Sequence, residues 1–453
     1  MRLARRLAVL LALPVLAGCG AGRVSAPPPP ARRPNVILIT VDTLRRDHLS
    51  CYGYARHTSP NIDRLAARGL RFANAYSQAP WTTPSIGALL TSRYPTELGI
   101  HDAPDRLSDR FITLAEMLRA AGYRTGAVIS HFFIDSEWNF QQGFESFDQS
   151  NVLGHRGISS PGVTRQALEF ARAHAGEPFF LWAHYFDPHY DYLEHPGFRF
   201  GDAAGYHGPI SSELQYTELV RLLPTLTDRD RQRLLDLYDS EIAFTDHSIG
   251  RLLDGLRKLR LLGDSLVVLT ADHGEEFLDH QGVGHGGTLY NEVIHVPLII
   301  KLPGPQAPHG VVGDPVGLID VYPTIAAALG IVPGEMLRGR SLLAPRPAGG
   351  SREIVWSETD WGKLRAVIDD RTKLILDLEN GNKQLFYLPT DPAEQRNLIA
   401  GMGGRPVLQE EFARLDHRLR GELAQISRAA IVAPHARLPD ELQAQLRALG
   451  YLR

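Results

Sequence analysis

The apolar run at 265–275 constrains the fold of this chain more than any other segment. Four successive aliphatic residues follow Ser265, a pattern typical of a strand buried on both faces of a parallel sheet. The run ends in Asp272, His273 and Gly274. Ligands of open α/β sheets bind beyond the carboxyl ends of the strands, where a carboxylate beside an imidazole can bind a divalent metal. For this run alone, a plain strand-end turn with Gly274 at positive φ is the alternative.

Three other predicted strands also run into acidic residues or imidazoles. They span 35–42, 125–130 and 179–184, and a glycine-rich loop at 282–287 adds one more imidazole. Because the carboxyl ends of parallel strands meet at one edge of a sheet, we expect the side chains that follow them to lie together. The candidate residues from these segments are Asp42, His131, Asp187, His189 and His285.

Helical patterns alternate with these strands, which favours an α/β fold. The segment Thr82-Thr83-Pro84-Ser85 leads into an apolar stretch, and we expect a helix that begins near Thr82 with Pro84 in its first turn. A hydroxyl there lies at the positive end of the helix dipole, where anions bind. The alternative is an ordinary helix-capping threonine. Other expected elements are helices from Pro60, at 114–121, at 236–256 and near 322–330, and a strand at 296–302.

From about residue 351 the sequence changes to short alternating segments. Strands are predicted at 353–358, 364–369 and 372–377, and helices at 407–424 and 440–449. The sequence therefore predicts a main domain at 35–345 with a central, mostly parallel sheet flanked by helices. A C-terminal subdomain at 346–453 is expected to contain a small antiparallel sheet and terminal helices.

Residues 1–19 are typical of a bacterial lipoprotein signal peptide. Three arginines precede an apolar run at 7–17, which is shorter than the ~20 residues that cross a bilayer. The run ends in Leu16-Ala17-Gly18-Cys19, which resembles a lipobox, so we expect Cys19 to be acylated. An ordinary cleaved secretory signal is the alternative.

The next residues, 20–34, contain four successive prolines and are expected to form a semi-rigid tether. Gly20 is not an acidic retention residue, which favours the outer membrane or the cell surface over the inner membrane. We therefore expect a lipid-anchored protein of the cell envelope. The only other cysteine is Cys51, so acylation of Cys19 leaves no disulfide. With 48 Lys and Arg against 51 Asp and Glu, no polycationic character favours nucleic acid as a partner.

Together these motifs resemble the sulfatase family of the alkaline phosphatase superfamily. The resemblance covers about residues 35–400, in the family's order, and implies an alkaline-phosphatase-like fold that hydrolyses ester bonds at a metal site. It also implies that Asp42, Asp272 and His273 hold the metal. The matching segments are Asn35–Arg45, Pro60–Leu65, Thr82–Ser85, Leu89–Pro95, Asp187–His189, Asp272–Gly274, Val296–Ile299, Gly339–Leu342 and Leu388–Leu398.

The chain departs from the family pattern at several positions. Family sulfatases carry a cysteine, or sometimes a serine, that is oxidised to formylglycine, and Thr82 holds that position here. Ile86 replaces the arginine that follows Pro-Ser, and Thr43 stands where many members have a second metal-binding aspartate. The lysine of the glycine-rich segment has no clear counterpart, although His285 is nearby.

The threonine changes the chemistry that the resemblance implies. Formylglycine hydrate can expel sulfate by breaking its own C–O bond, whereas threonine has one hydroxyl and cannot. A phosphorylated Thr82 can be hydrolysed by in-line attack at phosphorus when a metal balances the charge. We therefore expect hydrolysis of phosphate monoesters, diesters or phosphonates, with sulfate ester hydrolysis as the alternative. Transfer of a phospho group to an acceptor and a non-catalytic carbohydrate-binding protein are further alternatives.

The expected site contains one divalent ion, with Thr82 as nucleophile and metal ligand. Zinc is favoured over calcium or manganese because His273 is a ligand. By the resemblance, His189 binds the ester and can protonate its leaving group, whereas His131 and His285 are candidates for catalysis, substrate binding or a supporting role. The substrate is expected to be a small-molecule or glycan ester. A second ion, at Asp191 and His195, is not expected.

Overall fold

A computed structural model describes residues 33–153, 157–202, 204–344, 355–438, 440 and 443. The predicted signal peptide, Cys19 and nearly all of the tether lie outside these residues. So do the predicted boundary at 345–346 and most of the helix predicted at 440–449. The described residues from Pro34 onward pack as one unit. Within the described parts of the chain, no helix combines the length and the hydropathy that a membrane span requires.

The unit is built on an eight-stranded sheet with the order β10-β2-β9-β6-β1-β5-β3-β4. All neighbouring strands are parallel except β9, which runs antiparallel to both β2 and β6. The predicted mostly parallel sheet is therefore confirmed. The strands are β1 (Val36–Val41), β2 (Leu70–Tyr76), β3 (Arg124–Val128), β4 (Ser146–Asp148), β5 (Phe179–Tyr185), β6 (Leu266–Ala271), β9 (His295–Lys301) and β10 (Gly310–Gly317).

The register of the central strands places the candidate site. In β1, Val41 lies opposite Tyr185 of β5 on one side and Ala271 of β6 on the other, with all three strands parallel. Every residue of these three strands is buried, because helices cover both faces of the sheet. Asp42 and Asp272 are the residues directly after β1 and β6, and they therefore emerge side by side at one edge.

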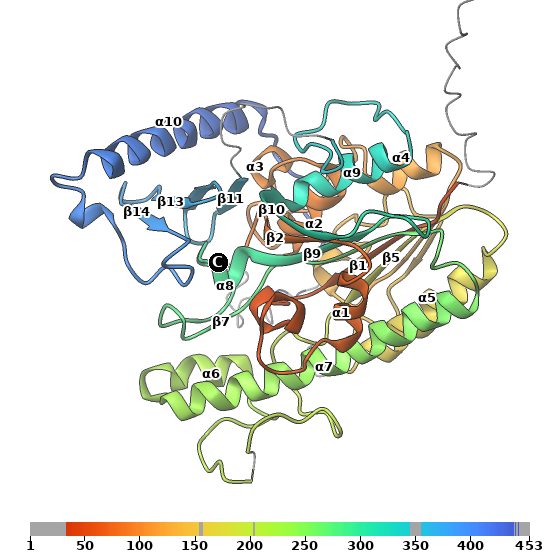
Figure 1. Cartoon of the computed structure of the whole chain (residues 1–453), viewed down its shortest axis with the longest axis horizontal. Coiled ribbons are helices and arrows are strands. Elements are labelled where there is room, and N and C mark those ends of the chain that lie inside the picture. The colour runs from red at the N-terminus through yellow and green to blue at the C-terminus, as the bar shows by residue number, and fades with distance from the viewer. Residues whose placement is uncertain are drawn as a thin grey trace, which may run out of the picture. The chain divides into compact units, whose positions relative to one another are not determined.

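Helices form a layer on each face of this sheet. Figure 1 shows α1, α5 and α7 on one face and α2, α4 and α9 on the other. The longest helix, α7, begins at Asp228, where the Thr227 hydroxyl accepts a hydrogen bond from the backbone N–H of Asp230. The helices are α1 (Pro60–Ala66), α2 (Thr82–Thr91), α3 (Pro95–Leu98), α4 (Leu114–Ala120), α5 (Ser160–Ala173), α6 (Tyr216–Leu222), α7 (Asp228–Lys258), α8 (Asn291–Ile294), α9 (Val321–Ala328) and α10 (Pro406–Ala429).

The predicted C-terminal antiparallel sheet is also confirmed, with four strands in the order β11-β12-β13-β14. They are β11 (Val355–Thr359), β12 (Leu364–Ile368), β13 (Thr372–Asp377) and β14 (Lys383–Tyr387). One face of the sheet packs against α10 through an apolar cluster that includes Trp356 and Leu415. The opposite face packs against Tyr76 of β2 and Ile294 of α8. The small sheet is thus joined to the main sheet close to the edge where Asp42 and Asp272 emerge.

Candidate active site

Thr82 is the first residue of α2 and faces the end of β6. Trp81 holds the helix-capping position, and its side chain makes no capping hydrogen bond. The Thr82 side chain is buried, and its Oγ1 lies 3.3 Å from Nε2 of His273. Pro84 suits the first turn of the helix, and Ser85 ties that turn to β6 because its hydroxyl donates to the carbonyl oxygen of Asp272. The hydroxyl of Thr82 therefore faces an imidazole instead of capping the helix.

Asp42, Asp272 and His273 form a compact cluster of potential metal ligands. One atom from each lies within 4.8 Å of the others, and among the described residues this is the one such group of three or more. The cluster is fully buried. In the part of the chain that the structure describes, neither carboxylate oxygen of Asp42, nor Oδ2 of Asp272, has a hydrogen-bond partner. Buried carboxylates are stable only when they are paired or bind a metal, so these residues fit a divalent cation.

The electrostatics of the cluster also fit a cation. Burial, and then the neighbouring Asp272 carboxylate, raise the pKa of Asp42 well above its usual value. Two close carboxylates repel each other when both are ionised, and a positive ion between them removes that repulsion. Nδ1 of His273 donates a hydrogen bond to the carbonyl oxygen of Gly274 at 2.9 Å. Because a carbonyl only accepts, Nδ1 carries the proton in the neutral ring and Nε2 is left to face the carboxylates.

His184, which the sequence analysis did not select, also lies against Asp42. Its Nε2 is 3.4 Å from Oδ2 of Asp42. Trp182 donates to Oγ1 of Thr40, whose own hydroxyl hydrogen can then go to Nδ1 of His184 at 2.8 Å. Burial lowers the pKa of His184 to about 4. Its neutral ring therefore presents Nε2–H toward the carboxylate. The sequence does place His184 at the end of a buried strand. A histidine inside an apolar run is usually a core residue, so this position alone did not point to the site.

His131 approaches the same carboxylate from the loop after β3. Its Nε2 lies 3.6 Å from Oδ2 of Asp42, and its Nδ1 accepts a hydrogen bond from the backbone N–H of Phe133. The ring of His189 lies 5.6 Å from the ring of His131, measured between centroids. The structure thus brings His131 and His189 to the cluster, as the strand-end pattern predicts.

His285 completes the cluster from the loop after β8 (Val283–Gly284). Its ring centroid lies 4.3 Å from that of His273 and 5.0 Å from that of His189. Nδ1 of His285 lies 2.9 Å from Oε1 of Glu275, and the Tyr192 hydroxyl donates to the other oxygen of that carboxylate. Burial raises the pKa of Glu275 to about 8. The sequence analysis missed Glu275 as a functional residue, although it follows the Asp-His-Gly motif directly.

The other acidic and imidazole candidates have different partners. Oδ1 of Asp187 accepts hydrogen bonds from Ser159 and Oδ2 accepts one from the backbone N–H of Ser160, so this carboxylate holds the start of α5. Asp191 accepts from the backbone N–H of Tyr216. His195 lies 2.7 Å from Glu241 of α7.

Several known proteins resemble this chain in sequence and in fold. The family model described as Sulfatase matches residues 34–331. Human arylsulfatase A is 29% identical over 373 residues, which cover 69% of this chain and 67% of that protein. A solved complex with the substrate D-glucosamine-2-N,6-O-disulfate has a TM-score of 0.72 at 20% identity, covering 87% of this chain and 98% of the other. The phosphonate monoester hydrolase of Silicibacter pomeroyi has a TM-score of 0.70 at 22% identity, covering 87% and 96%. At these identities the two structures show a shared fold.

Proposed function

Because this chain belongs to the sulfatase family, we propose that it hydrolyses phosphate-type esters at its metal site with Thr82 as the nucleophile. Family members are metal-dependent ester hydrolases, and the substrates proposed here are phosphate monoesters, phosphodiesters or phosphonates. One observation carries the proposal. Thr82 is the buried first residue of α2. Its Oγ1 lies 3.3 Å from Nε2 of His273 in the Asp42–Asp272–His273 cluster.

The nucleophile determines the preferred reaction. Attack by Oγ1 of Thr82 on phosphorus forms a phosphothreonine and releases the alcohol of the substrate. Water must then attack phosphorus in line, which breaks the P–Oγ1 bond and regenerates the hydroxyl. Threonine has no second hydroxyl through which it could expel a bound sulfate or phosphate by breaking its own C–O bond. The release step therefore depends on attack at the central atom, which is well supported chemistry for phosphoryl groups.

The surrounding residues are proposed to bind the metal, stabilise the anionic group and protonate the leaving group. Asp42, Asp272 and His273 would hold the divalent ion, which supplies a Lewis acid that favours the alkoxide of Thr82. The N-terminal end of α2, where Thr82 lies, would favour the anionic group of the ester through the helix dipole. The ring of His285 lies 4.3 Å from that of His273 and 5.0 Å from that of His189, so either imidazole is a candidate to protonate the leaving group. Glu275 orients His285 through its contact with Nδ1.

A sulfate ester is the second candidate substrate. This candidate is supported by the sequence identity to human arylsulfatase A, 29%, which is higher than the 22% identity to the phosphonate monoester hydrolase. The same residues would act, with attack at sulfur in both steps.

The remainder of the substrate has space beside Trp361. The rings of Trp361 and Trp81 stack at 4.5 Å, which places Trp361 next to the residue that precedes Thr82. Trp361 lines a cavity of about 380 Å³ together with His101, Asp102 and Lys363. An indole with neighbouring charged groups suits a sugar ring, so we propose a small-molecule or glycan ester as the substrate.

A paired substrate series tests the proposed function. Aryl sulfate, phosphate monoester, phosphodiester and phosphonate substrates with the same leaving group would be assayed with the mature protein after metal analysis. We expect the highest kcat/KM for one of the phosphorus esters. A clear preference for the sulfate would contradict the phosphorus assignment and support the second candidate. Metal-bound protein that cleaves none of the four would contradict both.

A further inference from the structure

The segment that carries His273 is held in place by the end of α8. The backbone N–H of Glu275 donates to the carbonyl oxygen of Glu292 at 3.0 Å, and the N–H of Gly274 donates to that of Val293 at 2.6 Å. The carbonyl of Ile294 accepts from the N–H of Ser77. The last carbonyls of a helix have no partner within the helix, so here the active-site backbone supplies those partners.

The contact between this segment and α8 is close. A Cβ atom added to Gly274 would lie 2.1 Å from the carbonyl oxygen of Glu292, so only glycine fits at this position. Ser77 is in turn connected to the active site. Its hydroxyl lies 2.8 Å from that of Ser85, and Ser85 donates to the backbone carbonyl oxygen of Asp272. Small movements of α8 would therefore move the backbone on both sides of the metal cluster.

A buried ion pair in the C-terminal sheet holds the other end of α8. Nζ of Lys373, on β13, lies 2.8 Å from Oε1 of Glu394, and both side chains are completely buried. Oε2 of Glu394 accepts a hydrogen bond from the backbone N–H of Asn291, the first residue of α8, at 2.6 Å. Nζ of Lys373 also donates to Oδ1 of Asn291, and Nδ2 of Asn291 donates to the carbonyl oxygen of Pro392.

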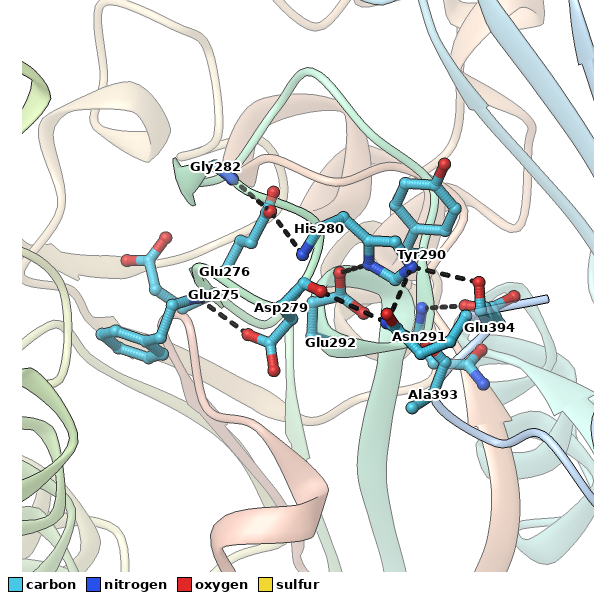
Figure 2. Close-up of polar contacts among 12 residues, drawn as sticks. Glu275, Glu276, Asp279, His280, Gly282, Tyr290, Asn291, Glu292, Ala393 and Glu394 are labelled. Atoms are coloured by element: carbon cyan, nitrogen blue, oxygen red, sulfur yellow. Dashed lines mark hydrogen bonds and ion pairs between the residues drawn. The ribbon is translucent and has the colours of Figure 1, made fainter. Parts of the chain in front are cut away.

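His280 supplies a parallel connection. It lies 2.5 Å from Oε1 of Glu292 through Nδ1 and 3.2 Å from the carbonyl oxygen of Glu394 through Nε2, and its ring stacks on Tyr290. Figure 2 shows Asn291 and Glu292 between Glu394 on one side and the segment from Glu275 to His280 on the other. Two separate sets of contacts thus connect the C-terminal sheet to the residues that follow the metal ligands.

We propose that the buried Lys373–Glu394 pair is a positioning device that fixes α8 and, through α8, the backbone of the metal-binding residue His273. The inference rests on the metal site of the proposed function and does not depend on which ester is cleaved. Burying two charges is a poor way to gain stability, because well-packed apolar residues often replace such a pair without loss. The pair instead fixes a geometry, because its groups also hold the backbone N–H and side chain of Asn291.

The test separates position from stability. Lys373→Met alone leaves a buried carboxylate unpaired and is expected to destabilise the protein. The double variant K373M/E394L removes both charges, so its thermal unfolding temperature should return close to that of the wild type. The partners of the backbone N–H and of Oδ1 of Asn291 remain lost in this variant. We therefore expect it to bind Zn²⁺ roughly 10- to 100-fold more weakly than the wild type, as is usual when supporting contacts of a metal ligand are removed.

Hydrogen exchange provides a readout that needs neither metal nor substrate. The amides of Gly274 and Glu275 should exchange faster in the metal-free double variant than in the metal-free wild type. The matched control is K383M/D416L, which removes the partly exposed Lys383–Asp416 pair between β14 and α10, whose Nζ–Oδ1 distance is 2.7 Å. This control should keep wild-type Zn²⁺ affinity and wild-type exchange at both amides.

The inference is overturned if folded K373M/E394L binds Zn²⁺ and exchanges these amides as the wild type does. If the double variant does not fold, Asn291→Ala decides by the same two measurements, because it removes the side-chain contacts and leaves the ion pair intact. Wild-type protein that binds Zn²⁺ but cleaves no ester contradicts the proposed function alone. Altered exchange in the variants would still support the positioning role.

Discussion

The position of Thr82 distinguishes two roles that share one sequence signature. A helix-capping threonine and a nucleophile at a helix start both precede an apolar helix. In this structure Trp81 occupies the capping position and the Thr82 hydroxyl points to His273, whereas Thr83 donates to the carbonyl oxygen of Phe133. The two neighbouring hydroxyls therefore have different environments, although sequence alone presents them as a pair.

Substitution of Thr82 should affect the rate and leave stability nearly unchanged. Thr82→Ala removes the attacking oxygen, so we expect kcat/KM to fall by several orders of magnitude. Loss of a cap would cost only about 1 kcal/mol of stability. Thr82→Ser should keep much of the activity, and Thr83→Ala is the matched control with a mild effect. Trapping of a phosphorylated peptide that contains Thr82 would support the covalent step, whereas normal turnover by Thr82→Ala would exclude it.

Glu241 should make the free energy of unfolding depend on pH. Burial raises its pKa to about 7, against the opposing effect of His195. A glutamate in the unfolded chain titrates near 4.3, so between about pH 4.3 and 7 the folded protein holds a proton that the unfolded chain has lost. This contribution to stability is therefore complete below about pH 4.3 and is lost as the pH rises to 7.

Glu241→Gln should remove that dependence. Relative to the wild type, the variant should become more stable by on the order of 4 kcal/mol between about pH 4.3 and 7, since each pKa unit corresponds to about 1.4 kcal/mol. Urea unfolding of the metal-free proteins at several pH values measures the difference. Glu379→Gln, at an exposed position, is the control and should give a curve parallel to that of the wild type. Parallel curves for Glu241→Gln itself would show that Glu241 is not the source.

At the scale of the elements, continuous aliphatic runs were the reliable signal. β1, β5 and β6 are mostly apolar and fully buried, and they were predicted. β2 was missed because its sequence, LRFANAY, mixes charged and polar residues into a strand near the sheet edge. β10 was missed because glycine and proline in GVVGDPVG are typical of turns. The first two turns of α7 consist mainly of charged residues, some of them buried, such as Asp230 and Arg233. They carry little apolar pattern, so the start of the helix was predicted eight residues too late.

Site residues were also predicted best where a continuous apolar strand precedes them. Residues directly after a clear strand, such as Asp42 and Asp272, could be predicted to converge. His184 could not be recognised, because a histidine inside an apolar strand has the same pattern whether it packs in the core or faces a ligand. Glu275 could not be recognised either, because its partner His285 is brought to it by a loop whose path the sequence does not specify.

The carboxylates after β1 and β6 should be needed for metal and dispensable for folding. Asp42→Asn and Asp272→Asn remove charge from a buried site where the two carboxylates repel each other. We expect each variant to lose bound metal and ester hydrolysis together. Their thermal unfolding temperatures should be no lower than that of the metal-free wild type. Metal analysis and calorimetry check the two outcomes, and a variant that keeps full activity without metal would contradict the mechanism.

At the scale of the whole molecule, we propose that the chain is attached to a membrane only through Cys19. Cys19→Ser should release the protein from membrane fractions and leave kcat/KM unchanged, because a proline-rich tether separates the anchor from the folded unit. Cys51→Ser is the control and should sediment like the wild type. A Cys19→Ser protein that still sediments with membranes would show that acylation is not the anchor.

The pairing of β1 with β6 has a consequence for how long the folded state survives. The two strands come from distant parts of the chain, and contacts across such long loops are expected to form late in folding because closing them costs entropy. An ion that needs both Asp42 and Asp272 binds only after these strands have paired, and it then stabilises the folded state by mass action. We therefore expect Zn²⁺ to slow unfolding and protect against proteolysis while the refolding rate, measured by stopped-flow, stays the same. The ion would thus stabilise the protein after folding is complete and would not help it to fold.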